Sequence, residues 1–246
     1  MTDRTDFGYE QVPVEDKAQR VRRVFDSVAG KYDLMNDLMS AGLHRLWKRF
    51  AVERDPRAPG MRVLDLAGGT GDLAVDFARR VGPDGEVVLT DINGTMLAGR
   101  AATASSTPAS SCPWYSATRN ELPFPDAHFD CVSIGFGLRN VTRKDECARR
   151  DAARAAGRAG SPRCSEFSRV WQPLAPAYDW YSFSVLPRLG QFAAGDGASY
   201  RYLAESIRMH PDQATLKTVM EESGFDRVDF HNLTAGVVAL HLGYRF

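Results

Sequence analysis

Residues 63–72 read VLDLAGGTGD, and they are followed by LAVDFARR up to Arg80. An apolar run that breaks into glycines and then adopts helical spacing predicts a β-strand, a tight turn and a helix. Glycine permits positive φ and lets a ligand approach the main chain, while the first turn of a helix offers N–H groups without intrahelical partners. The stretch therefore predicts a nucleotide-type binding turn in an α/β protein.

Two cofactors could use this turn. Gly69, Thr70 and Gly71 begin a loose match to the dinucleotide pattern GxGxxG/A, which allows NAD. Asp65 lies inside the predicted strand, where a carboxylate suits the cationic amino-acid end of S-adenosylmethionine better than the negatively charged pyrophosphate of NAD. Alternatively, Asp65 is a strand-end acid that is only capped or paired.

Asp91 closes the second predicted strand, which runs from Val87 to Thr90. A carboxylate at this point can accept hydrogen bonds from ribose hydroxyls, and both cofactors carry that ribose. The alternative is that Asp91 is a turn residue before Asn93 and Gly94.

Composition limits the class of protein. The 246 residues can bury a real core, and they predict a cofactor-binding domain over residues 56–246 with a helical extension over residues 1–55. Lys and Arg total 31, as do Asp and Glu, so no net basic field argues for nucleic acid. The four cysteines show no CxxC spacing and the five histidines no HExxH, which predicts no disulfide framework and no metal. Without an apolar run of membrane-spanning length, a cytoplasmic protein is expected.

The remaining elements follow from periodicity. We expect a loose segment up to Pro13, an amphipathic helix from Glu15 to Val28 and a second helical face over Leu43–Ala51, whose aromatic and Met stripes are more typical of core. A third strand, Phe129–Ile134, leads into residues 135–140, which should lie beside the glycine turn at the carboxyl ends of the strands. Arg139 and Asn140 could bind a ligand there, or make a salt bridge and a cap.

The C-terminal part adds a dense aromatic segment, residues 170–186. Aromatic residues between prolines are expected to form a lid over an apolar ligand or, alternatively, ordinary core. A helix containing Leu216 and Met220 and stopped by Gly224 precedes two closing strands, Arg227–Asn232 and Val237–His241.

Taken together, these residues resemble the ubiquinone/menaquinone-biosynthesis C-methyltransferases. The glycine turn by itself is typical of any class I methyltransferase, whereas the combination of phrases is specific to the family and covers about four-fifths of the chain. The matching phrases are SVAGKYD (27–33), HRLWK (44–48), DLAGGTGD (65–72), LPFPD (122–126), FGLRN (136–140), YRYLAESI (200–207) and AGVVALH (235–241).

The resemblance implies a Rossmann-like fold: a mostly parallel twisted sheet with helices on both faces, an antiparallel C-terminal strand and an N-terminal helical extension. It implies transfer of a methyl group from S-adenosylmethionine to a ring carbon of a prenylated benzoquinol or demethylmenaquinol. An NAD-linked oxidoreductase and a catalytically silent binding protein remain as alternatives. A lipid-tailed substrate would bring a protein without a spanning helix into peripheral contact with the inner face of the membrane. The oligomeric state is left open.

Site residues follow from the turn and from the resemblance. The cofactor is expected to contact Asp65, Gly69 and Gly71, and the resemblance adds a set of further contacts, of which three depart from the family's usual residues. The family commonly has Asp or Asn followed by Ala at the adenine positions and Ser after the third strand. The added contacts are Thr70, Asp91, Thr118, Arg119 and Gly135. The residues that differ from the family's usual ones are Thr118, Arg119 and Gly135.

The chemistry suggests the catalytic residues. A phenol ionises near pH 10, so forming phenolate at pH 7 costs roughly 4 kcal/mol. We therefore assign Arg139 as cationic partner or relay, Asn140 as orienter and Tyr32 as a hydrogen-bonding group for the substrate, with His210 and Asp33 as reserve bases.

Two stretches lack the apolar pattern that the rest of the chain keeps. Residues 98–120 and 142–166 contain no Val, Ile, Leu, Phe or Met, although a helix and a strand are expected in each. Intact motifs flank both stretches at about the family's usual spacing. This pattern is what a pair of compensating frame shifts in a GC-rich gene, or reading errors in its sequence, would produce. Burial of an apolar side chain contributes roughly 1.5–3 kcal/mol to stability, and about five such strand residues are lost. We therefore expect a protein of marginal stability that is weakly active or inactive in catalysis. We also expect poor order in both stretches and a central strand short or missing near Cys164.

Overall fold

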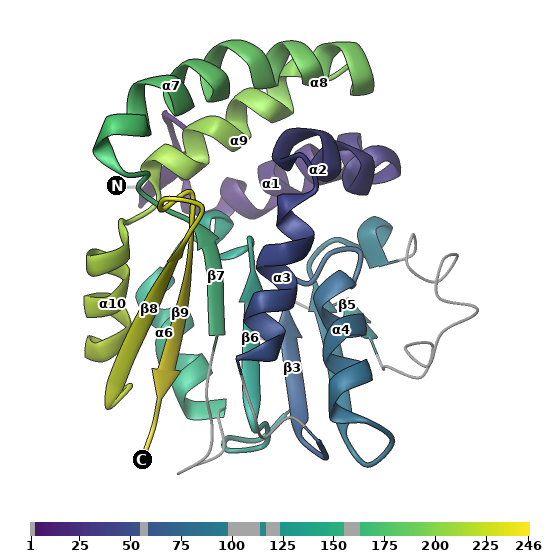
Figure 1. Cartoon of the computed structure of the whole chain (residues 1–246), viewed down its shortest axis with the longest axis vertical. Coiled ribbons are helices and arrows are strands. Elements are labelled where there is room, and N and C mark those ends of the chain that lie inside the picture. The colour runs from purple at the N-terminus through teal and green to yellow at the C-terminus, as the bar shows by residue number, and fades with distance from the viewer. Residues whose placement is uncertain (1–2, 55–58, 98–113, 117–123, 155–162) are drawn as a thin grey trace.

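The computed structural model describes residues 3–54, 59–97, 114–116, 124–154 and 163–246. Its centre is a seven-stranded sheet whose first five strands in spatial order are parallel, and the sixth strand runs antiparallel to both of its neighbours (Figure 1). In that order the strands are β5 (Trp114–Ser116), β4 (Glu86–Asp91), β3 (Arg62–Leu66), β6 (Cys131–Gly135), β7 (Arg163–Phe167), β9 (Val238–Tyr244) and β8 (Arg227–Leu233). This order confirms the predicted Rossmann-like α/β fold.

Helices cover both faces of the sheet because its strands are apolar on both sides. Successive residues of β3 illustrate this: Val63 packs against α4, whereas Leu64 packs on the opposite side against α10. The face helices are α3 (Leu43–Glu53) and α4 (Asp72–Val81) on one side, and α6 (Lys144–Arg154) and α10 (Gln213–Glu222) on the other (Figure 1).

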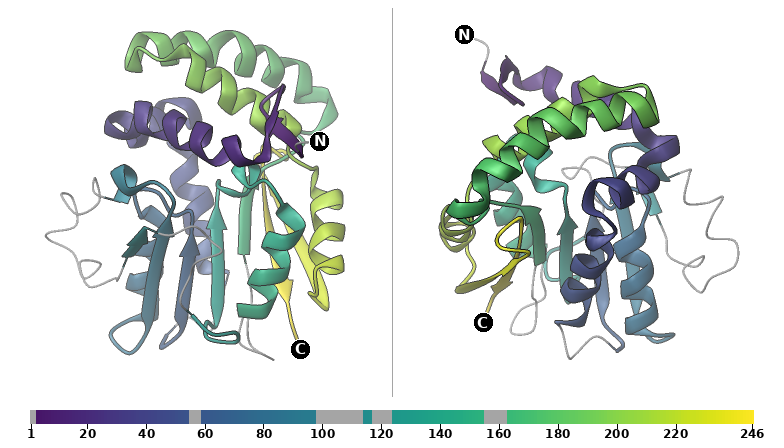
Figure 2. Two further views of the ribbon diagram at one scale, coloured as in Figure 1. Left: turned by 180° about the vertical axis from the view of Figure 1, so that it is seen from behind. Right: turned by 45° about the horizontal axis from the view of Figure 1, so that its top comes forward.

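The remaining helices form a cap above the carboxyl ends of the parallel strands (Figure 2). One half of the cap comes from the N-terminal part of the chain and the other from the aromatic segment and its continuation, so residues far apart in sequence lie together here. Its members are α1 (Val14–Val28), the 3-10 turn η1 (Ala29–Lys31), α2 (Tyr32–Ser40), α7 (Ala175–Trp180), the π-helical turn η7 (Tyr181–Val185), α8 (Leu186–Ala194) and α9 (Gly197–Met209). The proposed domain boundary near residue 55 falls outside the described residues and stays a prediction.

The expectation of a loose N-terminus is wrong for residues 4–13. Strands β1 (Arg4–Phe7) and β2 (Glu10–Pro13) pair as an antiparallel hairpin. Val12 is fully buried, and the ring of Phe7 stacks on Tyr202 of α9 with 4.2 Å between ring centroids. The hairpin is held by these apolar contacts with the cap, which a mostly polar sequence pattern does not reveal.

The expectation that the central strand near Cys164 is short or missing is also wrong. Strand β7 has five residues, as many as β3 and β6, and it pairs with β6 on one side and β9 on the other. Helix α6 likewise forms within the second stretch, and β5 lies within the first. Main-chain pairing with two apolar neighbours provides hydrogen bonds whatever the side chains, so the strand forms although Ser165 and Glu166 are buried in it.

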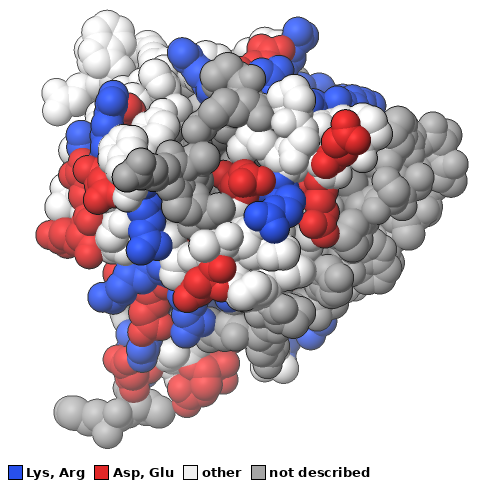
Figure 3. All heavy atoms as spheres, turned by 90° about the horizontal axis from the view of Figure 1, so that it is seen from below, with Lys and Arg blue, Asp and Glu red and all other residues white. Residues whose placement is uncertain are grey.

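Charge on the opposite end of the molecule is mixed. Viewed from below, acidic and basic side chains alternate over the described surface (Figure 3). No helix within the described residues is both long and apolar enough to span a bilayer.

Candidate active site

Two adjoining cavities lie where the sheet meets the cap. The strand-end cavity, of about 550 Å³, is bordered by Asp91, the ends of β3 and β6, α1 and the start of α6. The cap cavity, of about 150 Å³, is bordered by α2, α3, the glycine turn and the aromatic segment. The two share a wall made of Phe25, Tyr32, Ala67, Gly69, Gly135, Phe136 and Asn140. A ligand in one cavity would therefore meet a ligand in the other at this wall.

The glycine turn has the geometry that the sequence predicted. Gly69 and Gly71 have φ of +57° and +83°, and Gly71 precedes the first turn of α4. A Cβ atom at Gly68 would lie 2.1 Å from Leu89 Cδ1, so only glycine fits there. Gly69 and Thr70 line the cavities, whereas Gly71 is not among the lining residues and provides the positive φ before α4.

Asp91 ends β4 and lines the strand-end cavity. Its carboxylate accepts hydrogen bonds from the N–H groups of Gly69 at 2.9 Å and Asn93 at 2.8 Å. Burial raises its pKa above the usual value, against the effect of these N–H groups. Because a carboxylate has about four acceptor positions, lone pairs remain for a ribose in the cavity.

Asp65 takes a different position from the expected one. Its side chain is fully buried beneath the turn, where a Cβ atom on Gly68 would lie 2.6 Å from Oδ2, and Asp65 is not among the residues that line either cavity. Any influence of Asp65 on a ligand would therefore pass through the glycine turn. Thr118 and Arg119 lie outside the described residues.

The segment after β6 lies beside the turn, as predicted. Gly135 and Phe136 line both cavities, and Phe136 has a φ of +58°, which is rare for a non-glycine residue. A Cβ atom on Gly135 would lie 2.3 Å from Leu73 Cδ1, so a serine at this position would require Leu73 to move. Gly135, which stands where the family commonly has Ser, therefore fits the position of the Leu73 side chain.

Arg139 lies in a buried ion pair and also lines the cap cavity. Its Nη1 donates to Glu166 Oε1 at 2.7 Å and to the carbonyl of Phe136, while its main-chain N–H donates to Glu166 Oε2 at 3.1 Å. Burial works against both charges, yet Arg139 keeps the pKa of Glu166 below its usual range. Nε of Arg139 has no hydrogen-bond partner among the described residues. Arg139 therefore both forms the salt bridge that was expected as an alternative and lines the cap cavity.

Asn140 and Tyr32 complete the shared wall. Asn140 accepts a hydrogen bond from the Tyr202 hydroxyl at 2.9 Å through Oδ1, which fixes the amide. Burial raises the pKa of Tyr202 to about 12, so this hydroxyl stays a donor. Tyr32 begins α2 and is close enough to Arg139 to influence the pKa of that guanidinium. The structure therefore brings Arg139, Asn140 and Tyr32 together.

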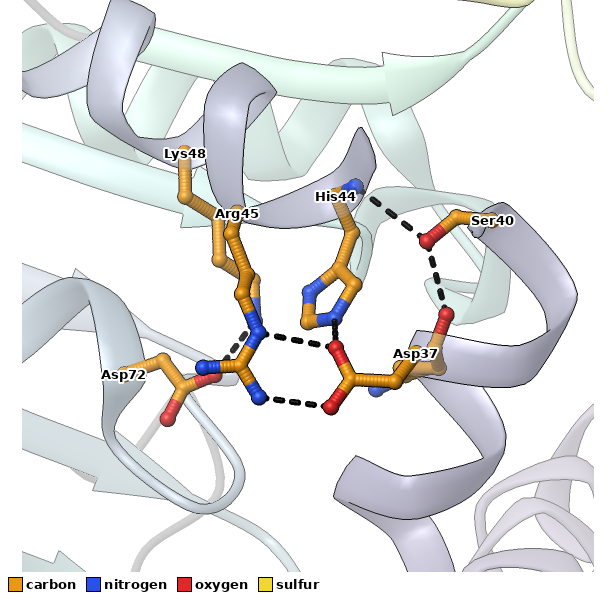
Figure 4. A network of polar contacts seen from close by, with 7 residues as sticks. Asp37, Ser40, His44, Arg45, Lys48 and Asp72 are labelled. Atoms are coloured by element: carbon orange, nitrogen blue, oxygen red, sulfur yellow. Dashed lines mark hydrogen bonds and ion pairs between the residues drawn. The ribbon is translucent and has the colours of Figure 1, made fainter. Parts of the chain in front are cut away.

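Figure 4 shows a polar network that sequence reasoning did not single out, and four of its members, Ser40, His44, Lys48 and Asp72, line the cap cavity. His44 Nε2 lies 2.8 Å from Asp37 Oδ1, and Arg45 donates to both oxygens of Asp37 at 2.8 and 2.6 Å. Lys48 pairs with Asp72 at 2.8 Å where α4 starts. The signal was the spacing of Asp37 and His44 across the Ala41–Gly42 turn, whose positive φ values fold α3 back onto α2.

Of the two reserve bases, His210 is not among the residues that line either cavity. His210 ends α9 beside Glu166, is buried, and has no hydrogen-bond partner on either ring nitrogen among the described residues. The position of the Asp33 side chain is not described. His210 is therefore linked to the site through Glu166.

His210 predicts an acid-sensitive stability. Burial, partly offset by Glu166, lowers its pKa from 6.5 to about 4. As pH falls, the histidine is protonated in the unfolded chain before it is protonated in the folded protein. The stability that the neutral, buried His210 contributes is therefore complete above pH 6.5 and is lost between pH 6.5 and pH 4. At about 1.4 kcal/mol per pKa unit, the loss amounts to about 3 kcal/mol. Urea unfolding across this range should show a His210→Leu variant losing less stability than the wild type. Parallel curves for both proteins would contradict the assignment.

Comparisons with known proteins identify the family. The sequence model of the ubiE/COQ5 methyltransferase family matches residues 14–245. The chain belongs to this family. The ubiquinone/menaquinone biosynthesis C-methyltransferase UbiE of Bordetella avium is 58% identical over 98% of this chain and 93% of that protein. The protein of the same description from Ralstonia pickettii is 56% identical over 98% of each.

Solved structures support the fold alone. A SAM-dependent methyltransferase from Aquifex aeolicus has a TM-score of 0.55 at 14% identity, covering 76% of this chain and 84% of that one. The [4+2]-cyclase SpnF has a TM-score of 0.62 at 16% identity, covering 89% and 76%. Since a cyclase shares this fold, fold by itself does not define methyl transfer. Family membership does: the chain is an S-adenosylmethionine-dependent methyltransferase, and the NAD alternative is not supported.

Proposed function

We propose that the protein transfers a methyl group from S-adenosylmethionine to a ring carbon of a prenylated quinol, either a demethylmenaquinol or a 2-methoxy-6-polyprenyl-benzoquinol. The observation that carries this proposal is the shared wall, where a donor in the strand-end cavity and an acceptor in the cap cavity would meet. The relatives' description as ubiquinone/menaquinone biosynthesis C-methyltransferases supports this substrate class.

The residues of the strand-end cavity fit the cofactor. Asp91 offers acceptors to ribose hydroxyls, and Gly69 of the glycine turn borders the same cavity. Gly69, Thr70 and Gly135 would border its amino-acid end and reactive centre. When bound, S-adenosylmethionine supplies an already activated methyl group, so the protein's task is alignment and activation of the acceptor, of which alignment can contribute about 7–11 kcal/mol.

The cap cavity fits an apolar ring that carries hydroxyls. Aromatic and aliphatic side chains border it, including Phe136, Phe167 and Leu186. Arg139 presents its unpartnered Nε–H to the oxygen that becomes negative as the phenol ionises, Asn140 orients that oxygen, and Tyr32 hydrogen-bonds the substrate. Low exposure of Arg139 strengthens this interaction because water does not screen it.

One assay tests the proposal directly. Purified protein is incubated with methyl-labelled donor and each quinol class, and the lipid extract is analysed for label. We expect label in at least one quinol. Binding of S-adenosylhomocysteine without any methylated lipid would instead indicate a silent methyltransferase-fold protein.

Asp91→Ala should weaken binding of S-adenosylhomocysteine by about 1–3 kcal/mol, because ribose hydroxyls would lose their acceptors. Isothermal titration calorimetry measures the change. Asp91→Asn keeps one acceptor oxygen and should lose less. Asp84→Ala, at an exposed turn before β4, serves as the control and should bind like the wild type. Unchanged affinity in Asp91→Ala would mean that the end of β4 does not hold the ribose.

The same lipid substrate leads us to propose that the protein contacts the membrane surface peripherally. Large apolar side chains are exposed on the aromatic segment and α8, with Trp180 65% and Phe192 92% exposed. Between residues 170 and 187 the only charged side chain is Asp179, which pairs with Arg208. Tyr178, Tyr181 and Leu186 of this segment face the cap cavity. A bilayer is therefore a suitable occupant for the outer side, next to the cavity that would take the tail.

Vesicle flotation tests this contact. We expect the wild type to float with phosphatidylcholine vesicles and to resist moderate salt, because apolar side chains carry the binding. The variant Trp171→Ser/Trp180→Ser/Phe192→Ser should lose most of it, whereas Leu46→Ser, which removes an exposed apolar side chain from α3, should not. Equal flotation of both variants would contradict the surface, and a carbonate-resistant integral pellet in cells would contradict peripheral contact.

A further inference from the structure

His44 and Asp37 form a pair that the reaction described so far does not use. Both come from the α2–α3 corner, and His44 is only 5% exposed while lining the cap cavity. Nε2 of His44 lies 2.8 Å from Asp37 Oδ1, and the main-chain N–H of His44 donates to Ser40 Oγ at 3.2 Å (Figure 4). The ring is thus anchored at one nitrogen, and its backbone is held in place.

The second ring nitrogen makes no hydrogen bond to the described residues. Nδ1 of His44 is buried and has no hydrogen-bond partner among the side chains that the structure describes. Asp37 accepts two hydrogen bonds from Arg45 and stays ionised, because these bonds hold its pKa below the usual range. An ionised carboxylate accepts a hydrogen bond from Nε2–H, and this tautomer leaves Nδ1 as a lone-pair acceptor. This carboxylate–imidazole arrangement orients a general base.

Charged groups on the neighbouring elements agree with a neutral imidazole. Burial lowers the pKa of His44 below its usual value. The hydrogen bond to Asp37 acts in the opposite direction, and Lys48 adds to the lowering. Lys48 is itself paired with Asp72 on α4, and Arg45 faces Asp37 rather than the ring. At neutral pH the ring therefore accepts a proton rather than carrying one.

We propose that His44, oriented by Asp37, is the general base that takes the phenol proton of the substrate. This inference rests on the proposed quinol methylation. The phenol proton moves to Nδ1 of His44, and the electron pair of the O–H bond is delocalised into the ring. The ring carbon then forms its bond to the methyl carbon as the carbon–sulfur bond breaks, with that electron pair remaining on sulfur. Loss of the proton on the methylated carbon to water restores aromaticity while His44 returns its proton to the oxygen, so one proton is released overall.

This role divides the work between two side chains that line the cap cavity. His44 removes the proton, and Arg139 stabilises the negative oxygen that results. Arginine is a poor proton acceptor because its pKa lies above 12, whereas a neutral imidazole is suited to the task. With His44 as the base, neither His210 nor Asp33 is needed for this step.

Substitutions separate catalysis from packing. His44→Ala should lower kcat by about 10²–10⁴-fold with little change in binding of S-adenosylhomocysteine, and added imidazole should restore part of the rate. Asp37→Asn should also lower kcat, because an amide that donates to Nε2 forces the proton onto Nδ1. The wild-type rate should rise with pH through the ionisation of His44, and this limb should be absent in His44→Ala. His231→Gln, a histidine of β8 outside both cavities, is the matched control and should behave like the wild type.

Wild-type turnover in His44→Ala, or a loss that imidazole does not restore and that leaves the pH profile unchanged, would overturn the role of His44. A readout independent of turnover keeps the two proposals apart. Nitrogen NMR of the ring should find the proton on Nε2, and a proton on Nδ1 at neutral pH would contradict the base even if quinol methylation is observed. If wild-type protein methylates neither quinol, the proposed function fails, while the tautomer still decides whether His44 is poised as a base.

Discussion

Arg139→Ala is expected to lower kcat by about 10²–10³-fold, the usual cost of removing one donor that stabilises developing negative charge. The loss should appear in turnover far more than in affinity for S-adenosylhomocysteine, because the interaction begins only when the phenolate forms. Steady-state kinetics and calorimetry on the same preparation measure the two quantities.

The buried ion pair complicates this single variant. Glu166 is 1% exposed, so removing Arg139 leaves an unpaired buried carboxylate, and such a loss typically costs about 3–5 kcal/mol of stability. Arg139→Leu combined with Glu166→Gln removes both charges and should fold better while still losing kcat. Arg139→Lys keeps the charge and should retain more of the rate. If the double variant turns over normally, or if turnover and affinity fall equally in Arg139→Ala, the residue is structural.

The second large effect concerns the whole chain. We expect the protein to unfold at lower denaturant concentration than a domain of its size usually does, because polar side chains occupy places that apolar ones normally fill in a parallel sheet. In β7, Ser165 and Glu166 are buried, and Asp151 and Arg154 are buried on α6. The structure forms both elements, so the expected deficit is one of side-chain burial rather than of missing backbone pairing.

Two measurements test this expectation. Resequencing the gene through residues 98–120 and 142–166 tests the compensating frame shifts, and denaturant unfolding measures the free energy. A variant carrying the corrected frame is the matched control and should gain about 7–15 kcal/mol if five strand positions become apolar. A confirmed frame together with cooperative melting and normal turnover would show that the frame-shift interpretation is wrong.

The sequence by itself determined the apolar strands of the sheet and the cofactor turn. VLDLAGGTGD predicted β3, the turn and α4 because apolar runs, glycines and helical spacing act over a few neighbouring residues. Asp91, Gly135 and Arg139 were placed near this turn because parallel strands bring their carboxyl ends to one edge. The helix before Gly224 and the antiparallel closing strands were likewise confirmed.

Only the tertiary structure decided which side chains meet. Arg139 and Glu166 are 27 residues apart, and they meet because β7 lies beside β6, a pairing that the polar sequence of β7 hid. The stacking of Phe7 on Tyr202 and the burial of Asp65 beneath Gly68 depend equally on how distant elements pack. The Asp37–His44 pair is closer in sequence, yet its place on the cap cavity depends on how the α2–α3 corner sits over the strand ends. Local patterns specify elements, whereas a site built from several elements is specified by their register and packing, which no single stretch encodes.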